Sequence, residues 1–204
     1  PFTSHPINIA GNLAIIDAAS SGRAYCGFAR GAWLDFLGLN PSKPISALRE
    51  AMACVRHLLR KDKNPFIGEH FHLQGGDVLR WQEIRPDIPF LLGSWGRKTM
   101  EACLPLAAEI KLGGTANPGT ARHLKSCLKQ RSAAARVVIG AVTVVDRDGA
   151  AARDLARREV ALYLPVVAGL DPTVTIEADR LHAIREAMQR YDVEKAVTYI
   201  SDDL

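Results

Sequence analysis

Residues 88–118 have the sequence IPFLLGSWGRKTMEACLPLAAEIKLGGTANP, and this stretch decides the expected fold. Ile88–Gly93 is a short apolar run, which is typical of a strand buried in a parallel sheet. A glycine-containing turn and a predicted helix over Arg97–Ala108 follow. Glu109–Gly113 is a second short strand that also ends in a glycine turn. The stretch therefore predicts a strand–helix–strand unit with parallel strands.

The same alternation continues on both sides of this stretch. Apolar residues at helical spacing and short apolar runs predict the following elements: helix Ile7–Ser20, strand Arg23–Ala29 buried on both faces, helix Ser46–Arg60, a helix after Pro118, strand Arg136–Val145 and helix Arg147–Ala168. Strands that alternate with helices predict an α/β fold with a parallel sheet, either doubly wound or closed into a barrel.

Two features favour the barrel. No GxGxxG sequence follows any predicted strand, so the main dinucleotide signature of doubly wound folds is missing. Glycine and polar residues recur just after the strand ends, where (β/α)8 (TIM) barrel enzymes carry their sites. Only four strands are predicted in 204 residues, whereas such a barrel needs about 250 residues. We therefore expect residues 1–204 to form one incomplete barrel domain.

Residues Asn64–Trp81 interrupt the alternation. Phe66–Leu73 followed by Gln74–Asp77 predicts a hairpin with a glycine turn. Two imidazoles and a carboxylate lie close together here, at Glu69, His70 and His72, and on a strand the two histidines would share one face. No second cluster of ligands accompanies them, so packing of the hairpin explains these residues better than a metal site.

Composition excludes several classes of protein. The chain is 48% hydrophobic and 24% charged, with no apolar run long enough to cross a membrane. Its net charge of +4 is spread along the sequence, and aromatic residues make up only 6%, so nucleic-acid binding is not expected. The four cysteines contain no CxxC pair, which argues against zinc and disulfide frameworks and favours a reducing cytoplasm.

No catalytic acid–base or nucleophile motif is present. The sequence contains no GxSxG, and its residues show no Ser–His–Asp order. Asp146 and Asp148 are better explained as acidic residues at a helix start, where they complement the helix dipole. This pattern suits an enzyme whose organic cofactor performs the chemistry.

Several motifs, taken in order, resemble the luciferase-like monooxygenase superfamily over about residues 5 to 170. His5-Pro6 and Ser20–Arg23 match the segment before the family's fourth strand. The further counterparts are the fourth strand and loop (Gly22–Trp33), the hairpin insertion (Gly68–Gly76), the fifth strand with its phosphate loop (Ile88–Gly96) and the sixth strand (Glu109–Pro118). The last of these is closest to the deazaflavin-dependent branch, which includes methylene-tetrahydromethanopterin reductases.

The resemblance implies strands four to seven of the barrel, with the N-terminal strands and the last strand missing. It also implies hydride transfer between reduced coenzyme F420, an 8-hydroxy-5-deazaflavin, and a small organic substrate, within a homodimer. FMN is the alternative cofactor, in a luciferase-like monooxygenase. The catalytic residues stay unassigned, because the family's ring-contacting strand precedes this part of the fold.

By the same resemblance, the turns after the fifth and sixth strands would bind the coenzyme through Gly93, Ser94, Trp95, Gly96, Gly113 and Gly114. Free N–H groups at a helix start favour phosphate, although an ordinary loop with a solvated Arg-Lys pair explains the first turn as well. The substrate pocket would include Arg30, Gly31, Trp33 and Thr115. A surface arginine and a core tryptophan remain the alternative for Arg30 and Trp33.

Two further interpretations remain open. Asn117-Pro118 is typical of a helix cap with proline at the first helical position, independent of any ligand. The whole chain could instead be a non-catalytic barrel fragment or interaction module, because an incomplete barrel exposes edge strands that another chain can cover.

Overall fold

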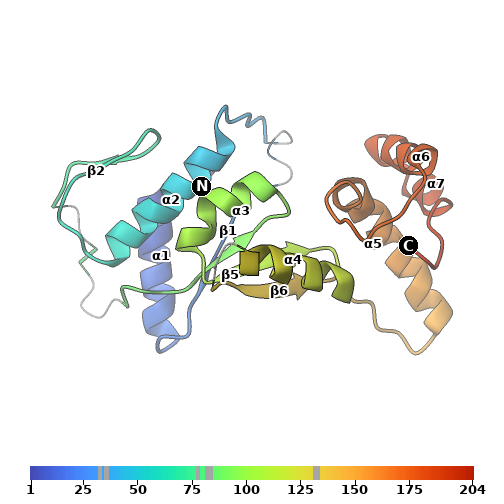
Figure 1. Cartoon of the computed structure of the whole chain (residues 1–204), viewed down its shortest axis with the longest axis horizontal. Coiled ribbons are helices and arrows are strands. Elements are labelled where there is room, and N and C mark those ends of the chain that lie inside the picture. Colours follow the sequence, from blue (N-terminus) through green and yellow to red (C-terminus); the bar gives the residue numbers. More distant parts are fainter. Residues whose placement is uncertain (32–33, 35–36, 77–78, 81–84, 131–133) are drawn as a thin grey trace. The chain divides into compact units, whose positions relative to one another are not determined.

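The computed structural model describes residues 1–31, 34, 37–76, 79–80, 85–130 and 134–204 (Figure 1). They form two compact units. The first comprises Pro1–Lys111 and Leu128–Val138, and the second comprises Leu112–Cys127 and Ile139–Leu204. Within these described ranges, no helix has the length and apolar character that crossing a membrane requires.

A four-stranded sheet has the strand order β1-β4-β5-β6. Its strands are β1 (Cys26–Ala29), β4 (Phe90–Gly93), β5 (Glu109–Gly113) and β6 (Arg136–Gly140). β1 pairs with β4, and β4 with β5, in parallel. The sheet confirms the predicted α/β fold with parallel strands.

Two helices pack against each other in the first unit: α1 (Pro6–Ala19) and α2 (Pro44–Leu59), drawn in blue and cyan in Figure 1. Each has a proline in its first turn, where the missing N–H costs nothing. The helical period of α2 buries Leu48, Met52, Val55 and Leu59 in one core with Ile88, Phe90 and Leu92 of the β4 segment. Both expected helices are confirmed, and so is the apolar face of α2. The apolar spacing predicted for α1 is only partly confirmed, because Leu13 is buried whereas Ile16 is 56% exposed.

A partly buried ion pair fixes the segments that precede β1 and β4. Asp17, near the end of α1, is 4% exposed and accepts hydrogen bonds from the Ala24 N–H (3.2 Å) and from Arg85 Nη2 (2.7 Å) and Nε (3.2 Å). Arg85 also donates to the Ala24 carbonyl at 2.7 Å. A bidentate guanidinium–carboxylate pair holds both partners in a defined orientation.

Two elements are shorter in the structure than expected. α3 (Arg97–Cys103) stops before Ala108 and continues as a 3-10 turn over Leu104–Leu106, because Pro105 cannot donate the next helical hydrogen bond. β1 is shorter than Arg23–Ala29, and only Phe28 of its residues is buried, so it is not covered on both faces.

β6 ends at Gly140 although the apolar run continues to Val145. The Gly140 carbonyl accepts from the N–H groups of Gly114 (2.7 Å) and Thr115 (3.3 Å), where β5 has already turned away. Without a neighbouring strand to supply hydrogen bonds, β-branched residues alone do not make a strand. Val145 is accordingly 89% exposed.

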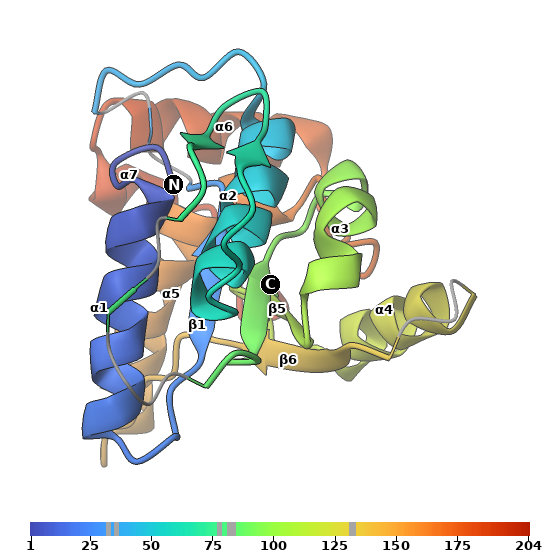
Figure 2. The ribbon, with the colours of Figure 1, turned by 90° about the vertical axis from the view of Figure 1, so that its left-hand side faces the viewer.

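The hairpin exists, but its turn lies elsewhere than predicted. β2 (Phe66–Ile67) pairs antiparallel with β3 (His72–Leu73), so the turn is formed by residues 68–71 and not by Gln74–Asp77. Figure 2 shows the hairpin beside α2.

A carboxylate from α2 determines where this turn lies. Glu50 accepts the backbone N–H groups of Glu69 (2.9 Å), His70 (2.8 Å) and Phe71 (2.6 Å). Desolvation raises the pKa of Glu50, but these three N–H donors outweigh it and leave the pKa below its ordinary value. A Cβ on Gly68 would lie 2.0 Å from the Glu50 Oε1, so a side chain there would displace the carboxylate from the turn.

Glu69 and His70 serve this packing. His70 Nε2 lies 3.1 Å from Ser46 Oγ, and Glu69 pairs with Lys43 while accepting from Ser46 Oγ at 3.3 Å. His72 belongs to β3. Contacts with α2 therefore account for Glu69 and His70. Across the described ranges, no group of three or more His, Cys, Asp or Glu side chains is placed to hold a metal ion.

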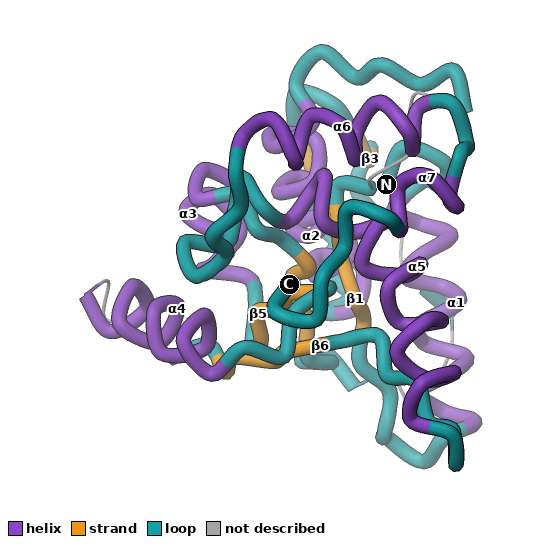
Figure 3. Tube along the Cα trace, turned by 90° about the vertical axis from the view of Figure 1, so that its right-hand side faces the viewer, coloured by secondary structure: helices purple, strands orange, loops and turns teal. Residues whose placement is uncertain are grey.

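The second unit is mostly helical (Figure 3). It contains α4 (Pro118–Gln130) up to Cys127, α5 (Gly149–Val167), α6 (Ala178–Gln189) and α7 (Val193–Val197). Asp148 caps α5 by accepting from the N–H groups of Ala150 (2.8 Å) and Ala151 (3.4 Å), which confirms its predicted place at a helix start. The sequence patterns had not identified α6 and α7. They pack with α5 around Ala161, Leu164, Ile184, Ala187, Ala196 and Ile200.

Candidate coenzyme and substrate site

The structure brings the turns after β1 and β4 to the same edge of the sheet. These strands are parallel neighbours, and Ala29 pairs with Gly93 at their ends. Arg30-Gly31 and Ser94–Gly96 therefore leave the sheet side by side. A Cβ on Gly93 would meet the Ala29 Cβ at 3.5 Å, so the two turns begin in close contact.

The turn after β4 uses part of its own hydrogen-bonding capacity. The Ser94 N–H donates to the Lys111 carbonyl at 3.2 Å, and Ser94 Oγ accepts the Gly96 N–H at 3.1 Å. Gly96 is the N-cap of α3, which has seven residues and no side-chain cap. Among the described residues, the Ser94 hydroxyl accepts but does not donate, so its hydrogen is left for a ligand.

Two cations follow this turn. Arg97 and Lys98 are exposed on the first turn of α3, and Arg97 Nε lies 3.1 Å from Glu101 Oε1. Such an exposed ion pair is weak and can be exchanged for a ligand contact. The turn is therefore positively charged where an anion would approach.

Arg30 and Gly31 line a small open pocket of about 230 Å³, together with Leu34, Leu39, Asn40, Pro41 and Pro44. Gly31 has φ +95°, a conformation that favours glycine. Arg30 is exposed. Trp33, the other residue expected here, lies outside the described residues.

The turn after β5 is held much more tightly. Gly114 has φ +82°, and a Cβ there would meet Val167 Cγ2 at 3.2 Å and Tyr163 Cδ1 at 3.7 Å. Its N–H donates to the Gly140 carbonyl at 2.7 Å. Glycine is thus required both by the backbone angle and by the close approach of α5.

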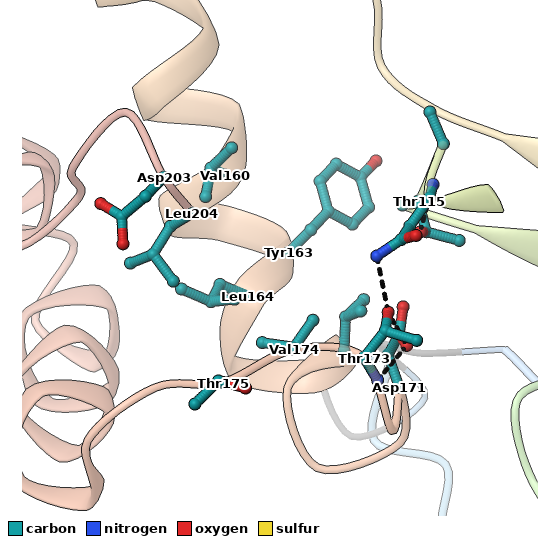
Figure 4. Close-up of a pocket in the computed structure, with 14 residues that line it drawn as sticks. Thr115, Val160, Tyr163, Leu164, Asp171, Thr173, Val174, Thr175, Asp203 and Leu204 are labelled. Atoms are coloured by element: carbon teal, nitrogen blue, oxygen red, sulfur yellow. Dashed lines mark hydrogen bonds between the residues drawn. The ribbon is translucent and has the colours of Figure 1, made fainter. Parts of the chain in front are cut away.

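A buried carboxylate braces the same turn (Figure 4). Asp171, which is 3% exposed, accepts the Thr120 hydroxyl at 2.9 and 2.8 Å, the Thr173 N–H at 2.9 Å and the Thr173 hydroxyl at 2.6 Å. Burial raises the pKa of Asp171, but hydrogen bonds from Thr173, Thr120 and Thr115 outweigh this and hold the pKa below its ordinary value.

Asn117 completes this network. Its Oδ1 accepts the Gly119 N–H at 2.8 Å, and its Nδ2 donates to Thr173 Oγ1 at 2.8 Å. The Asn117 N–H in turn donates to Thr115 Oγ1 at 3.1 Å. The predicted helix cap is confirmed, and it also ties the turn after β5 to the loop after α5.

These residues enclose a pocket of about 280 Å³ (Figure 4). Of the predicted site residues, Gly114 and Thr115 line it. The other lining residues are Ala116, Asn117, Val160, Tyr163, Leu164, Val167, Asp171, Thr173, Val174, Thr175, Asp203 and Leu204. The α5 face and the Asp171 loop had been missed. The Asp171-Pro172-Thr173 sequence, typical of a side-chain-stabilised turn, is the signal that could have found the loop.

Three cysteines, of which Cys54 and Cys103 are buried and Cys26 is half-buried, offer no nucleophile. Desolvation raises the pKa of the Cys26, Cys54 and Cys103 thiols to about 11, so they are protonated at neutral pH. Their packing explains them without a catalytic role.

Comparison with known proteins then assigns the family. The sequence profile of the family described as "Luciferase-like monooxygenase" matches residues 1–204. The chain belongs to this family. The resemblance to this family that the sequence motifs indicated is therefore confirmed.

Several relatives of this luciferase-like chain carry one activity in their names. It is 29% identical to the 5,10-methylenetetrahydromethanopterin reductase of Archaeoglobus fulgidus over 92% of its own length and 58% of that protein. The enzyme of the same name from Methanolobus tindarius is 26% identical, with 87% of this chain and 55% of the relative covered. The chain thus spans little more than half the length of these two relatives.

Solved structures share the luciferase-like fold. The coenzyme F420 dependent tetrahydromethanopterin reductase of Methanopyrus kandleri superposes with a TM-score of 0.78 at 23% identity, covering 100% of this chain and 65% of that one. The monooxygenase RslO1 of Streptomyces bottropensis gives a TM-score of 0.64 at 20% identity over 99% of this chain and 66% of its own.

Proposed function

We propose that the chain is the part of a deazaflavin-dependent oxidoreductase that spans strands four to seven of a (β/α)8 barrel. Its reaction is hydride transfer between reduced coenzyme F420 and a small organic substrate, as in methylene-tetrahydromethanopterin reductases. The observation that carries this proposal is the 29% identity to the Archaeoglobus fulgidus reductase along 92% of this chain.

The turn after β4 fits the anionic end of such a coenzyme. Ser94 retains a hydroxyl hydrogen for a phosphate oxygen, and Arg97 and Lys98 add positive charge at the start of α3. Gly93 and Gly96 keep the backbone open to close approach. This fit comes from charge and hydroxyl donation more than from the helix dipole, since α3 is short.

The remaining residues position the reactants. When bound, the deazaflavin supplies the hydride. The Ser94–Gly96 turn would hold its tail, while the Arg30-Gly31 turn, which leaves the neighbouring strand, would contact the substrate. Fixing both groups at one sheet edge lowers the entropic part of the barrier.

Binding of the coenzyme tests the proposal. The chain is titrated with coenzyme F420 and with FMN, and ligand fluorescence is followed. Ser94→Asp places a carboxylate against the phosphate, and we expect it to weaken F420 binding at least about tenfold. Ser126→Asp, at an exposed position of α4, is the matched control for added charge.

The outcomes separate the candidate functions. Binding of F420 that Ser94→Asp weakens and Ser126→Asp does not supports the reductase. Preference for FMN moves the assignment to a flavin monooxygenase. Binding of neither coenzyme rejects the proposed function for this chain and favours an interaction module.

A further inference from the structure

A serine and a histidine meet where the hairpin packs against α2. Ser46 lies in the first turn of α2, and His70 lies in the turn between β2 and β3, 24 residues further along the chain. Ser46 Oγ and His70 Nε2 are 3.1 Å apart. A hydroxyl within hydrogen-bond reach of an imidazole is the arrangement that activates a serine as a nucleophile. Only the tertiary structure brings the two side chains together, so no sequence motif predicts the pair.

His70 is held in a defined orientation. Its backbone N–H donates to Glu50 Oε1 at 2.8 Å, and its ring lies beside the Phe71 ring, with 6.4 Å between the centroids. The side chain is 23% exposed, which leaves it within reach of a small molecule. The packing of the hairpin therefore explains why His70 lies here, and it also fixes the imidazole with Nε2 beside the hydroxyl. A base fixed by its neighbours is ready to take a proton.

Two acceptors compete for the hydrogen of the Ser46 hydroxyl. His70 Nε2 lies at 3.1 Å, and Glu69 Oε2 lies at 3.3 Å. The side-chain hydrogen bond from Lys43 lowers the pKa of Glu69 below its ordinary value, so this carboxylate is a weak base. With its own proton on Nδ1, His70 can accept the serine proton at Nε2. The imidazolium that forms then faces Glu69 Oε2 at 3.7 Å, and this opposite charge stabilises it.

Hydrogen-bond donors for an oxyanion lie beside the same hydroxyl. Ile45 and Ser46 follow Pro44 in the first turn of α2, where backbone N–H groups have no acceptor within the helix. The N-cap residue Lys43 makes no side-chain hydrogen bond to this turn. Among the described residues, the N–H groups of Ile45 and Ser46 have no partner. Two free N–H groups beside a nucleophile can stabilise the negative oxygen that develops on an attacked carbonyl.

The surroundings favour a small substrate. Neither of the two pockets described above is lined by Ser46 or His70. Binding energy from a deep cavity therefore contributes little, and the substrate itself has to carry a good leaving group. Activated esters and thioesters of short acyl groups have this property.

We propose that Ser46 and His70 form an acyl-transfer dyad, which takes an acyl group from a small activated ester or thioester and passes it to water. Ser46 Oγ attacks the carbonyl carbon while His70 takes the hydroxyl proton, and the leaving alcohol or thiol departs with that proton. Water then attacks the acyl-serine, one of its protons returns to Ser46 Oγ through His70, and the carboxylic acid is released. This activity is separate from the proposed hydride transfer and does not depend on it.

The small ester 4-nitrophenyl acetate tests the proposal on the full chain. We expect release of 4-nitrophenolate together with acetylation of Ser46, which is located by peptide mass spectrometry after rapid quenching in acid. Ser46→Ala should lower the rate of release at least about tenfold and leave this peptide unmodified. The acetylated position is read from the wild-type chain, so this result does not depend on how well a variant folds.

Two histidine variants test the base. His70→Gln removes the imidazole but keeps a polar side chain, and we expect it to lower the rate of release at least about tenfold. His72→Gln, at an exposed position of the same hairpin, is the matched control for the loss of an imidazole. Ser126→Ala, at an exposed position of α4, is the control for the loss of a hydroxyl. Both controls should keep the wild-type rate, and circular dichroism checks that each variant retains its helices.

The absence of acetylation, or acetylation confined to other residues, overturns the proposal. So does a rate of release that Ser46→Ala and His70→Gln leave unchanged. An equal loss in His72→Gln and His70→Gln also overturns it, because the reaction would then come from imidazoles in general. The coenzyme titration decides the proposed function separately.

Discussion

The glycine turns after β4 and β5 arise from the same local pattern but are held by different contacts. After β4, Gly96 is an N-cap with an ordinary backbone angle, and one serine hydroxyl supports it. After β5, Gly114 needs a positive φ, α5 packs against it, and Asp171 braces the residues that follow. The first turn keeps a donor and cations for a ligand, whereas the second satisfies its polar groups internally and shapes a pocket.

This difference shows that a turn of one sequence type can serve two purposes. Hydrogen bonds made within the protein fix a shape, and those left unmade remain for a ligand. If the comparison is correct, substitutions should cost far more stability at the β5 turn than at the β4 turn.

The largest effect is expected from Asp171→Ala. It removes the acceptor of the Thr120 and Thr173 hydroxyls inside the protein, and we expect a loss of about 2–4 kcal/mol in the free energy of unfolding. Hydrogen exchange should accelerate in peptides covering residues 113–121 and 168–176.

The tryptophans provide an internal control for this variant. All three, Trp33, Trp81 and Trp95, precede residue 112, so their fluorescence follows the first unit during urea unfolding. An unchanged exchange rate around Asp171, or equal destabilisation by exposed Asp179→Ala, would contradict the bracing role.

A smaller effect is expected from Gly114→Ala. The positive φ and the contact with Val167 Cγ2 should together cost about 1–3 kcal/mol. Gly113→Ala is the matched control, because its Cβ would meet no atom within 4 Å and its φ is not positive. The two adjacent variants are compared by thermal unfolding. Equal melting temperatures would show that the β5 turn is less constrained than its geometry indicates.

Ser94→Ala should cost less still, about 0.5–1.5 kcal/mol, since it removes one hydrogen bond to the Gly96 N–H. Tryptophan-detected urea unfolding measures this change, with exposed Ser126→Ala as the control. A loss as large as that of Asp171→Ala would remove the distinction between the turns.

The smallest effect is expected in the response to acid. Because the pKa of Asp171 lies below its ordinary value of 3.8 in the folded chain, its contribution to stability is present above that value. It is lost as the pH falls through the lowered folded pKa. Asp171→Asn removes this titration, so the variant should lose less stability than the wild type between pH 6 and about pH 3. Urea unfolding at the two pH values measures these losses. An equal loss in the free energy of unfolding for both proteins would contradict this prediction.

Much of the fold was predictable because local patterns agree with the packing. The apolar spacing of α2 and the strand Glu109–Gly113 were confirmed as expected. The errors arose where a distant group decides. β6 ends at Gly140 because its neighbour turns away, and the hairpin turn is placed by Glu50, which lies 19 residues before Glu69.

The candidate site was predictable only where it follows strand ends. Glycines after β4 and β5 are visible in the sequence as breaks in apolar runs. The pocket-lining residues of α5 could not be predicted in this way. Val160, Leu164 and Val167 have the spacing of an ordinary core-facing side of a helix. The contact between Asp171 and Thr120 could not be predicted either, because these residues are 51 positions apart and only the tertiary structure brings them together.

The contact between Glu50 and the hairpin couples two positions that lie far apart in the sequence, position 50 on α2 and position 68 in the turn. Any side chain at position 68 would collide with the carboxylate, and without that carboxylate three N–H groups of the turn lose their acceptor. A hairpin grafted onto another barrel would therefore need a carboxylate at the position that corresponds to Glu50 of α2. A side chain at position 68 would therefore move the Glu50 carboxylate and weaken its hydrogen bonds to the turn.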